Sequence, residues 1–200
     1  MITPPSMTQW AADTIKLGAA RGEQRAKLDL VRNVLTLLWN GEPVLRNANL
    51  SGIRLRYVDF SGFDLTKANF AGADLTGANF SGATLDNANM TGAQLTGANF
   101  CRASLDATIL RDATLRRAHF EHTNLSGAYM MGAKLEEALL FSCLMYGANM
   151  SGAQLECTHP EPWLQPTRLA YCTFDAETIW PDGFNAPSSS APMPTRLLRI

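Results

Sequence analysis

Charge is scarce in this 200-residue chain and is balanced in sign. Only 18% of the residues are charged, and 17 Lys and Arg stand against 18 Asp and Glu, which gives a formal net charge of -1. Proteins that bind nucleic acid directly neutralise phosphates with clustered cations. The composition therefore argues against a direct nucleic-acid binder.

Long apolar runs are also missing. No stretch approaches the roughly 18 to 20 apolar residues that a membrane span needs, and the first six residues lack the basic and apolar regions of a secretory signal. The four cysteines, Cys101, Cys143, Cys157 and Cys172, form no Cys-Xaa-Xaa-Cys pair. We expect a reduced, cytoplasmic protein with no membrane partner and no catalytic thiolate.

Aromatic residues are few, at 8%, although hydrophobic residues reach 46%. The reason is a repeat: every fifth residue from Leu45 to Leu155 is Leu, Phe or Met, which makes 23 positions in unbroken frame. Two residues before these centres, 16 of the 22 positions from Ala48 to Ala153 are Ala. The other six are Ile53, Val58, Phe63, Thr108, Thr123 and Cys143.

Neither a helix, with its period of 3.6, nor a flat strand, with its period of 2, explains a period of five. A unit with one large and one small inward side chain suits a chain that turns a corner every five residues. Asn or Asp often precedes the centre, as in Ala68-Asn69-Phe70, and both are typical of turns. The pattern Ala-(Asn/Asp)-Leu-Xaa-Xaa resembles the pentapeptide-repeat family over about residues 43–158.

That resemblance implies an all-β solenoid: a right-handed quadrilateral β-helix with four pentapeptides per coil, here about six coils. Residues 20 apart should then lie one above the other. Phe60, Phe80, Phe100 and Phe120 form such a column, followed by Leu140. We expect their rings to stack at the spacing of neighbouring strands, about 4.8 Å.

The repeats are flanked by segments without the five-residue frame. Residues 7–40 carry apolar residues in an amphipathic helical pattern, so we predict an N-terminal α-helical cap over residues 1–42. The β-helix is predicted over residues 43–158 and an irregular C-terminal closing segment over 159–185. Residues 186–200 are predicted to be a disordered tail.

Outward positions are mostly Asn, Asp, Ser, Thr and Gly, but the later coils depart from this. The candidate interface consists of the apolar residues Ile109, Tyr129, Met131, Leu139, Phe141, Leu144 and Tyr146. On the four-sided geometry they spread over three adjacent faces, and a contiguous apolar patch needs a cover. Two covers are open: the chain's own segment 163–184, or a homodimer or other protein partner.

The concentrated titratable residues are His119, Glu121 and His122, which should all point outward. They could form a shallow metal or acid–base site, or simply a solvated face. We favour the solvated face because a convex surface lacks a water-excluding pocket. The sequence therefore predicts no catalytic, cofactor-binding or metal-binding residue, and no cofactor.

These observations predict a non-enzymatic interaction or scaffold module, bacterial by resemblance, whose protein partner is unknown and which could be a homodimer through the C-terminal coils. Some members of the family mimic DNA, so the alternative is a DNA mimic that binds or protects a type II topoisomerase (gyrase). Mimicry needs a dense anionic surface. Residues 43–158 contain nine Lys and Arg against ten Asp and Glu, which does not make one.

Overall fold

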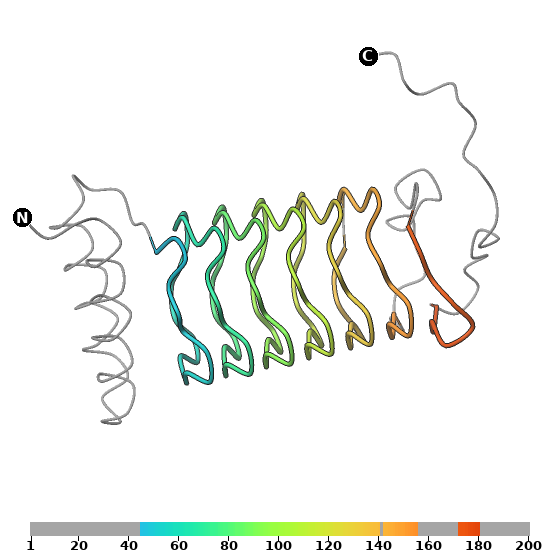
Figure 1. Ribbon diagram of the computed structural model, residues 1–200, viewed down its shortest axis with the longest axis horizontal. Helices are drawn as coiled ribbons and strands as arrows, with labels where there is room; N and C mark the ends of the chain where they lie inside the picture. Colours follow the sequence, from blue (N-terminus) through green and yellow to red (C-terminus); the bar gives the residue numbers. More distant parts are fainter. Residues whose placement is uncertain (1–44, 141, 156–171, 181–200) are drawn as a thin grey trace, which may run out of the picture.

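The computed structural model describes residues 45–140, 142–155 and 172–180 (Figure 1). The repeats form a rod of stacked coils, coloured from blue to orange in the figure. Within the described ranges there is no helix, and every β element is a single bridging residue between turns. The fold therefore depends on contacts between coils rather than on long strands.

Parallel bridges fix the register of the coils. Each bridging residue pairs with the residue 20 positions further on, from Asn49 with Asn69 to Lys134 with Gln154. A coil of four five-residue sides therefore takes 20 residues, which is the register that the columns in the sequence predict. We name the faces after their first central residues: the Leu45, Leu50, Leu55 and Phe60 faces.

Each repeat unit has five positions. In the unit Ala88–Gly92 the small residue Ala88 is first, Asn89 second, the central Met90 third, Thr91 fourth and Gly92 fifth. Three backbone N–H groups of a unit donate to neighbouring coils, and one closes the turn. In this unit the bonds run from Ala88 N to Leu85 O (2.9 Å), Asn89 N to Ala68 O (2.9 Å), Met90 N to Ile109 O (2.7 Å) and Gly92 N to Arg111 O (2.9 Å). The remaining donor, Thr91 N, bonds to Asn89 Oδ1 at 3.1 Å. All five donors are satisfied, the last one by a side chain.

The fifth position forms the corner of the coil in a left-handed conformation. From Asn47 to Gly152 every residue at this position has φ between 52° and 69°, and eleven of them are not glycine. Glycine adopts this conformation freely, whereas a side chain there costs roughly 1 kcal/mol or more. The sequence tolerates this strain at half of its corners.

The phenylalanine column stacks as predicted. Successive ring centroids of Phe60, Phe80, Phe100 and Phe120 lie 5.4, 5.1 and 5.0 Å apart, and the ring planes differ by 21°, 4° and 7°. All four side chains are fully buried. The distance between coils sets the ring spacing, so the aromatic stack and the backbone bridges share one repeat.

First positions that are not alanine also face the core. Ile53, Val58 and Phe63 are buried in the first coil. Thr108 and Thr123 are buried too, and their hydroxyls donate to Leu85 O at 2.8 Å and Phe100 O at 2.6 Å. These inward hydroxyls therefore carry no unsatisfied polar group into the core.

Residues 172–180 continue the stack on two faces. Thr173 pairs with Asn149 and Ile179 with Gln154, so the spacing between partners rises from 20 to 24 and 25. Phe174 and Trp180 pack edge to face with centroids 5.2 Å apart, and Trp180 also lies against the core. The predicted helical cap, the predicted tail and the limits of the four predicted segments lie outside the described residues.

Asp175 replaces a backbone carbonyl at the end of the rod. Gly132 N donates to a carbonyl of the next coil, but Gly152 N donates to Asp175 Oδ1 at 2.9 Å. The same oxygen accepts Glu177 N at 3.0 Å and the Thr178 hydroxyl at 3.2 Å. The bond from Gly152, together with the others, lowers the pKa of Asp175 against the opposing effect of desolvation.

We predict that removing one ring from the aromatic stack strongly destabilises the fold. Phe100→Ala should lower the free energy of unfolding by about 3–5 kcal/mol, because neighbours held by backbone bridges cannot collapse into the cavity. Phe100→Leu should cost clearly less, and urea denaturation of both variants measures the difference. A loss below about 1 kcal/mol for Phe100→Ala would show that the stack is not a rigid core.

A second prediction concerns acid. Because the pKa of Asp175 is lowered from 3.8, its stabilisation is complete above that value and is lost as the pH falls through the folded-state pKa. Amide protection at residues 172–180, corrected for intrinsic exchange rates, should therefore fall between pH 5 and 2 before that of residues 85–104. Asp175→Asn should remove this pH step, and its persistence in the variant would contradict the assignment to Asp175.

Candidate interaction surface

At ten second positions of the repeat an Asn or Asp side chain caps its own turn. There, Oδ1 of an Asn or Asp accepts the backbone N–H two residues further on, at Asn49, Asp59, Asp64, Asn69, Asp74, Asn79, Asn89, Asn99, Asn124 and Asn149. On the Phe60 face the side chains also bond from coil to coil, with Asn79 Nδ2 3.0 Å from Asp59 Oδ1 and Asn99 Nδ2 3.2 Å from Asn79 Oδ1. An outward Asn therefore stabilises both its own turn and the stacking.

This capping column is interrupted on the Leu50 face. The bridged column begins with three asparagines, continues with Ile109 and Tyr129, and returns to Asn149. Isoleucine has no acceptor, and the tyrosine oxygen stands at the end of a rigid ring that is too long to close a two-residue turn. The N–H groups of Arg111 and Met131 thus lack the side-chain cap that Asn49, Asn69, Asn89 and Asn149 provide in the same column. Each exchange costs about 0.5–1.5 kcal/mol.

The same departure occurs on two further faces, which are neighbours of each other. Leu139 and Leu144 occupy second positions on the Phe60 and Leu45 faces, and Tyr146 follows on the Leu45 face. We call the following set the C-terminal apolar patch: Ile109, Tyr129, Met131, Leu139, Leu144 and Tyr146. Tyr129, Leu144 and Tyr146 are 50%, 58% and 56% exposed, and Met131 is partly buried. Phe141, the remaining residue of the candidate interface, lies outside the described residues.

The described part of the closing segment does not cover this patch. Thr173 and Ile179 extend the columns of Asn149 and Gln154 at the end of the rod, coloured red in Figure 1. Residues 172–180 therefore lie beyond the last complete coil. The rest of the segment that was expected as a cover lies outside the described residues.

His119, Glu121 and His122 lie together on the outside of the fourth coil, and all three are exposed. His122 Nε2 is 3.8 Å from Glu121 Oε1. The described residues hold no group of three or more His, Cys, Asp or Glu placed to bind a metal ion. The geometry therefore offers an open surface pair and no enclosed ligand set.

The thiols show no activated cysteine among the described residues. Cys101 and Cys172 are partly buried and Cys143 is buried, and none of the three is in a disulfide. Burial raises the pKa of Cys172 to about 11. Its thiol is therefore protonated near neutral pH and a poor nucleophile.

Tyr57 is an exposed aromatic residue that the sequence pattern did not single out, and 70% of its surface is accessible. It occupies a corner with φ of 58°, and its ring lies over Gly77, where an added Cβ would come within 2.5 Å of the Tyr57 ring. The sequence contained the signal, since Tyr57 is the one aromatic residue at the fifth positions from Asn47 to Gly152.

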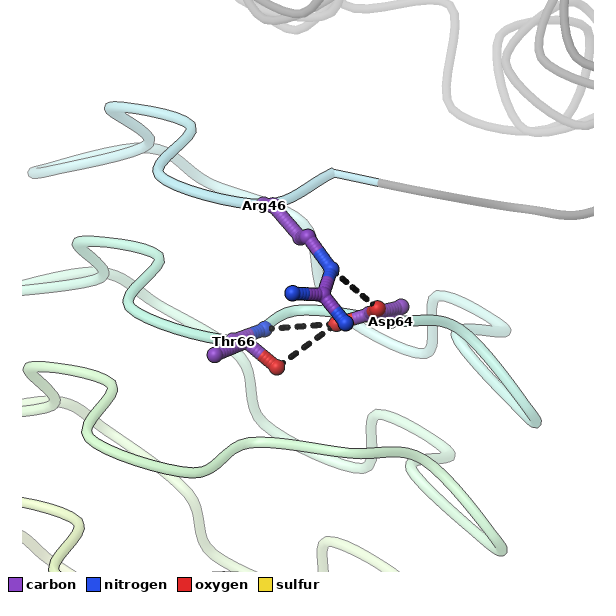
Figure 2. A network of polar contacts seen from close by, with 3 residues as sticks. All are labelled: Arg46, Asp64 and Thr66. Atoms are coloured by element: carbon purple, nitrogen blue, oxygen red, sulfur yellow. Dashed lines mark hydrogen bonds and ion pairs between the residues drawn. The ribbon is translucent and has the colours of Figure 1, made fainter.

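Arginine–carboxylate pairs join adjacent coils on the outer surface. Arg46 Nε is 2.5 Å from Asp64 Oδ2, and the other carboxylate oxygen accepts the N–H and hydroxyl of Thr66 at 3.1 and 2.7 Å (Figure 2). Desolvation raises the pKa of Asp64, but these bonds outweigh it and lower the pKa. Arg117 pairs with Glu137 at 2.6 Å, which lowers the pKa of that carboxyl. Exposed pairs add little stability, but they neutralise carboxylates that a DNA mimic would need.

A model of the pentapeptide repeat family, describing eight copies of the repeat, matches residues 44–82, 64–102, 98–136 and 108–145. The matched segments together span just over half of the chain. With the 20-residue coils described above, they show that this chain belongs to the pentapeptide repeat family.

Solved structures of pentapeptide repeat proteins are similar to it. One from the thylakoid lumen of Arabidopsis thaliana is 32% identical over 54% of this chain and 72% of its own, with a TM-score of 0.49. HetL, from the cyanobacterium Nostoc, is 28% identical over 72% of this chain and 66% of its own, with a TM-score of 0.37. A trypsin-treated form of QnrB1, a plasmid-mediated fluoroquinolone resistance protein, is 17% identical over 68% of this chain and 80% of its own. Its TM-score of 0.52 indicates a shared fold.

A comparison with curated proteins found no match. The described residues also include no helix with the length and hydropathy of a membrane span.

Asparagine should stabilise the rod at the second positions that the C-terminal apolar patch now occupies. Ile109→Asn and Tyr129→Asn should each raise the free energy of unfolding by about 0.5–1.5 kcal/mol, because the new Oδ1 can accept the N–H two residues on. The reverse change Asn89→Ile, one coil earlier in the same column, should lower it by a similar amount. Urea denaturation at submicromolar protein excludes any contribution from association. Destabilisation by Tyr129→Asn would mean that its ring stabilises the monomer.

Proposed function

We propose that this protein is a non-enzymatic, cytoplasmic interaction module, built on the right-handed quadrilateral β-helix of its family, that binds a protein through the C-terminal apolar patch. The observation that carries the proposal is the exchange of turn-capping positions for exposed apolar side chains in consecutive coils. Turn capping favours Asn or Asp at these positions, so we attribute the exposed apolar side chains found there to binding.

The composition of the patch supports a protein partner. Tyr and Met are enriched at the centres of protein interfaces, where aromatic anchors carry much of the binding energy. Tyr129 and Tyr146 combine large contact area with few rotatable bonds, so ordering them on binding costs little entropy. Exposed apolar groups on several adjacent faces exceed the scattered single residues that are normal on a surface.

The charge distribution supports a binding mode other than DNA mimicry. Carboxylates that would form an anionic stripe are paired with arginines, as Asp64 is with Arg46, Asp74 with Arg56 and Glu137 with Arg117. The likeness to QnrB1 is one of fold. A gyrase supercoiling assay with and without a quinolone tests the alternative, and specific inhibition or protection would replace the present proposal.

The proposal predicts that restoring the asparagine column abolishes binding without unfolding the protein. In pull-downs from lysate of the source organism, Tyr129→Asn should reduce capture of the partner at least tenfold. Thr114→Asn is the matched control, because Thr114 occupies the same second position on the Leu55 face and is far less apolar. Equal capture by both variants would exclude the patch as the binding surface.

A further inference from the structure

Within the described residues, five hydroxyl and thiol groups donate a hydrogen bond to the coil before their own. Thr108, Thr123 and Cys143 occupy first positions of the repeat. Cys172 and Thr178 directly precede the bridged residues of the closing segment, which is the equivalent place. Every acceptor is the carbonyl of a central residue. The bonds, which we call the inward clamps, run from Thr108 to Leu85 O (2.8 Å), from Thr123 to Phe100 O (2.6 Å), from Cys143 to Phe120 O, from Cys172 to Met145 O and from Thr178 to Met150 O (3.0 Å).

An inward clamp ties the turn of one coil to the same turn of the coil before it. Leu85 O accepts the N–H of Ala88 at 2.9 Å, which closes the turn within its own coil. The Thr108 hydroxyl bonds to the same oxygen from the next coil, and a carbonyl has two lone pairs for the two donors. Thr108 is fully buried, so water does not compete for this bond as it does at the surface. An inward clamp can therefore stabilise a coil by as much as an outward cap.

Caps and clamps occupy different parts of the rod. Of the ten Asn and Asp side chains that cap their own turn, eight lie in the first three coils, residues 45–102. Every first position from Ala48 to Ala103 is apolar, so these coils, as far as they are described, supply no clamp donor. From the fourth coil on, each coil has an inward clamp, and the two remaining caps are those of Asn124 and Asn149. The clamps therefore begin where the caps become sparse.

We propose that the inward clamps take over from the outward caps in the C-terminal coils and thereby free the second positions there for apolar side chains. Both kinds of contact add one hydrogen bond between a side chain and the backbone, and such bonds contribute similar amounts to stability. Each coil is stable only through its contacts with neighbouring coils, so a clamp compensates for a missing cap elsewhere in its own coil. This compensation stabilises the rod itself and does not depend on what the C-terminal apolar patch binds.

Three units place a clamp donor directly before an exposed apolar residue. The pairs are Thr108 with Ile109, Cys143 with Leu144 and Thr178 with Ile179. Tyr129 and Leu139 follow alanines instead, but both lie in the fifth coil, which Thr123 clamps to the fourth. The compensation is therefore a property of the whole coil rather than of the single unit.

The first experiment removes one clamp without changing the volume of the core. In the full chain, Thr108→Val replaces the hydroxyl with a methyl group of similar size, so the bond to Leu85 O is lost and the space stays filled. Native-state hydrogen exchange should show about fivefold lower protection of the fourth-coil amides, such as Ile109 N, which bonds to Ala88 O. Thr114→Val is the matched control, because Thr114 is an outward residue of the same coil, and it should change protection by less than about twofold. Equal protection in the two variants would overturn the inference.

The second experiment transfers a clamp to a coil that has none. In the third coil, Asn89→Ile removes the cap on Thr91 N, and urea denaturation should show an equilibrium constant of unfolding that is raised about fivefold. Adding Ala88→Thr supplies a hydroxyl at the first position of the same unit, with the carbonyl of Leu65 as its acceptor.

Adding Ala88→Val to Asn89→Ile instead fills the same space without a donor, so any crowding of the core is common to the two double variants. The double variant with Ala88→Thr should unfold with an equilibrium constant about fivefold lower than the one with Ala88→Val. Two double variants of equal stability would show that an inward clamp does not compensate for a lost cap.

Discussion

The interaction on which the structure depends is the hydrogen bonding between coils, because no unit satisfies its backbone alone. In each five-residue unit one N–H closes a turn, and three point to the coil before or after. The fifth has no backbone acceptor, and where the second position holds Asn or Asp that side chain can satisfy it, as Asn89 does for Thr91. The repeat pattern follows from this arrangement. Alanine is first because the interior is narrow, a large apolar residue is third because it fills the rod, and Asn or Asp is second because a donor is missing a partner.

Because of this hydrogen bonding, an outward residue at the second position can affect the stability of the rod. In an ordinary sheet an exposed position tolerates most side chains, so an exposed isoleucine says little. Here the second position is exposed and yet has a structural task, so an apolar residue there carries a measurable cost. Ile109 and Tyr129 incur that cost in consecutive coils, and Leu139 and Leu144 do so on two further faces. An equally exposed leucine at a position without a capping task would support no such argument.

Much of the repeat region could be read from the sequence, since one period determines both the fold and the direction of each side chain. The stacking of Phe80 between Phe60 and Phe100 and the burial of Ile53 or Thr108 follow from counting in fives and twenties. The candidate interface was found in the same way, as a departure from the expected outward residues. The bridges of the closing segment could not be predicted, because its sequence does not follow the five-residue repeat. Thr173 and Ile179 pair with residues 24 and 25 positions earlier, a spacing that no period in the sequence indicates. The bond from Gly152 to Asp175 joins residues whose proximity only the folded chain establishes.

A rod of this kind separates folding from recognition more completely than a globular domain does. The inward residues and the bridges are nearly the same in every coil, so they stabilise the rod without distinguishing one coil from another. The outward residues do vary along the rod, as where the asparagines of the Leu50 face give way to Ile109 and Tyr129. Because the coils fix these residues at regular spacing, the outward side chains of one column lie at a constant distance from one another. The periodicity that holds the coils together thus also sets the positions of the side chains in the C-terminal apolar patch.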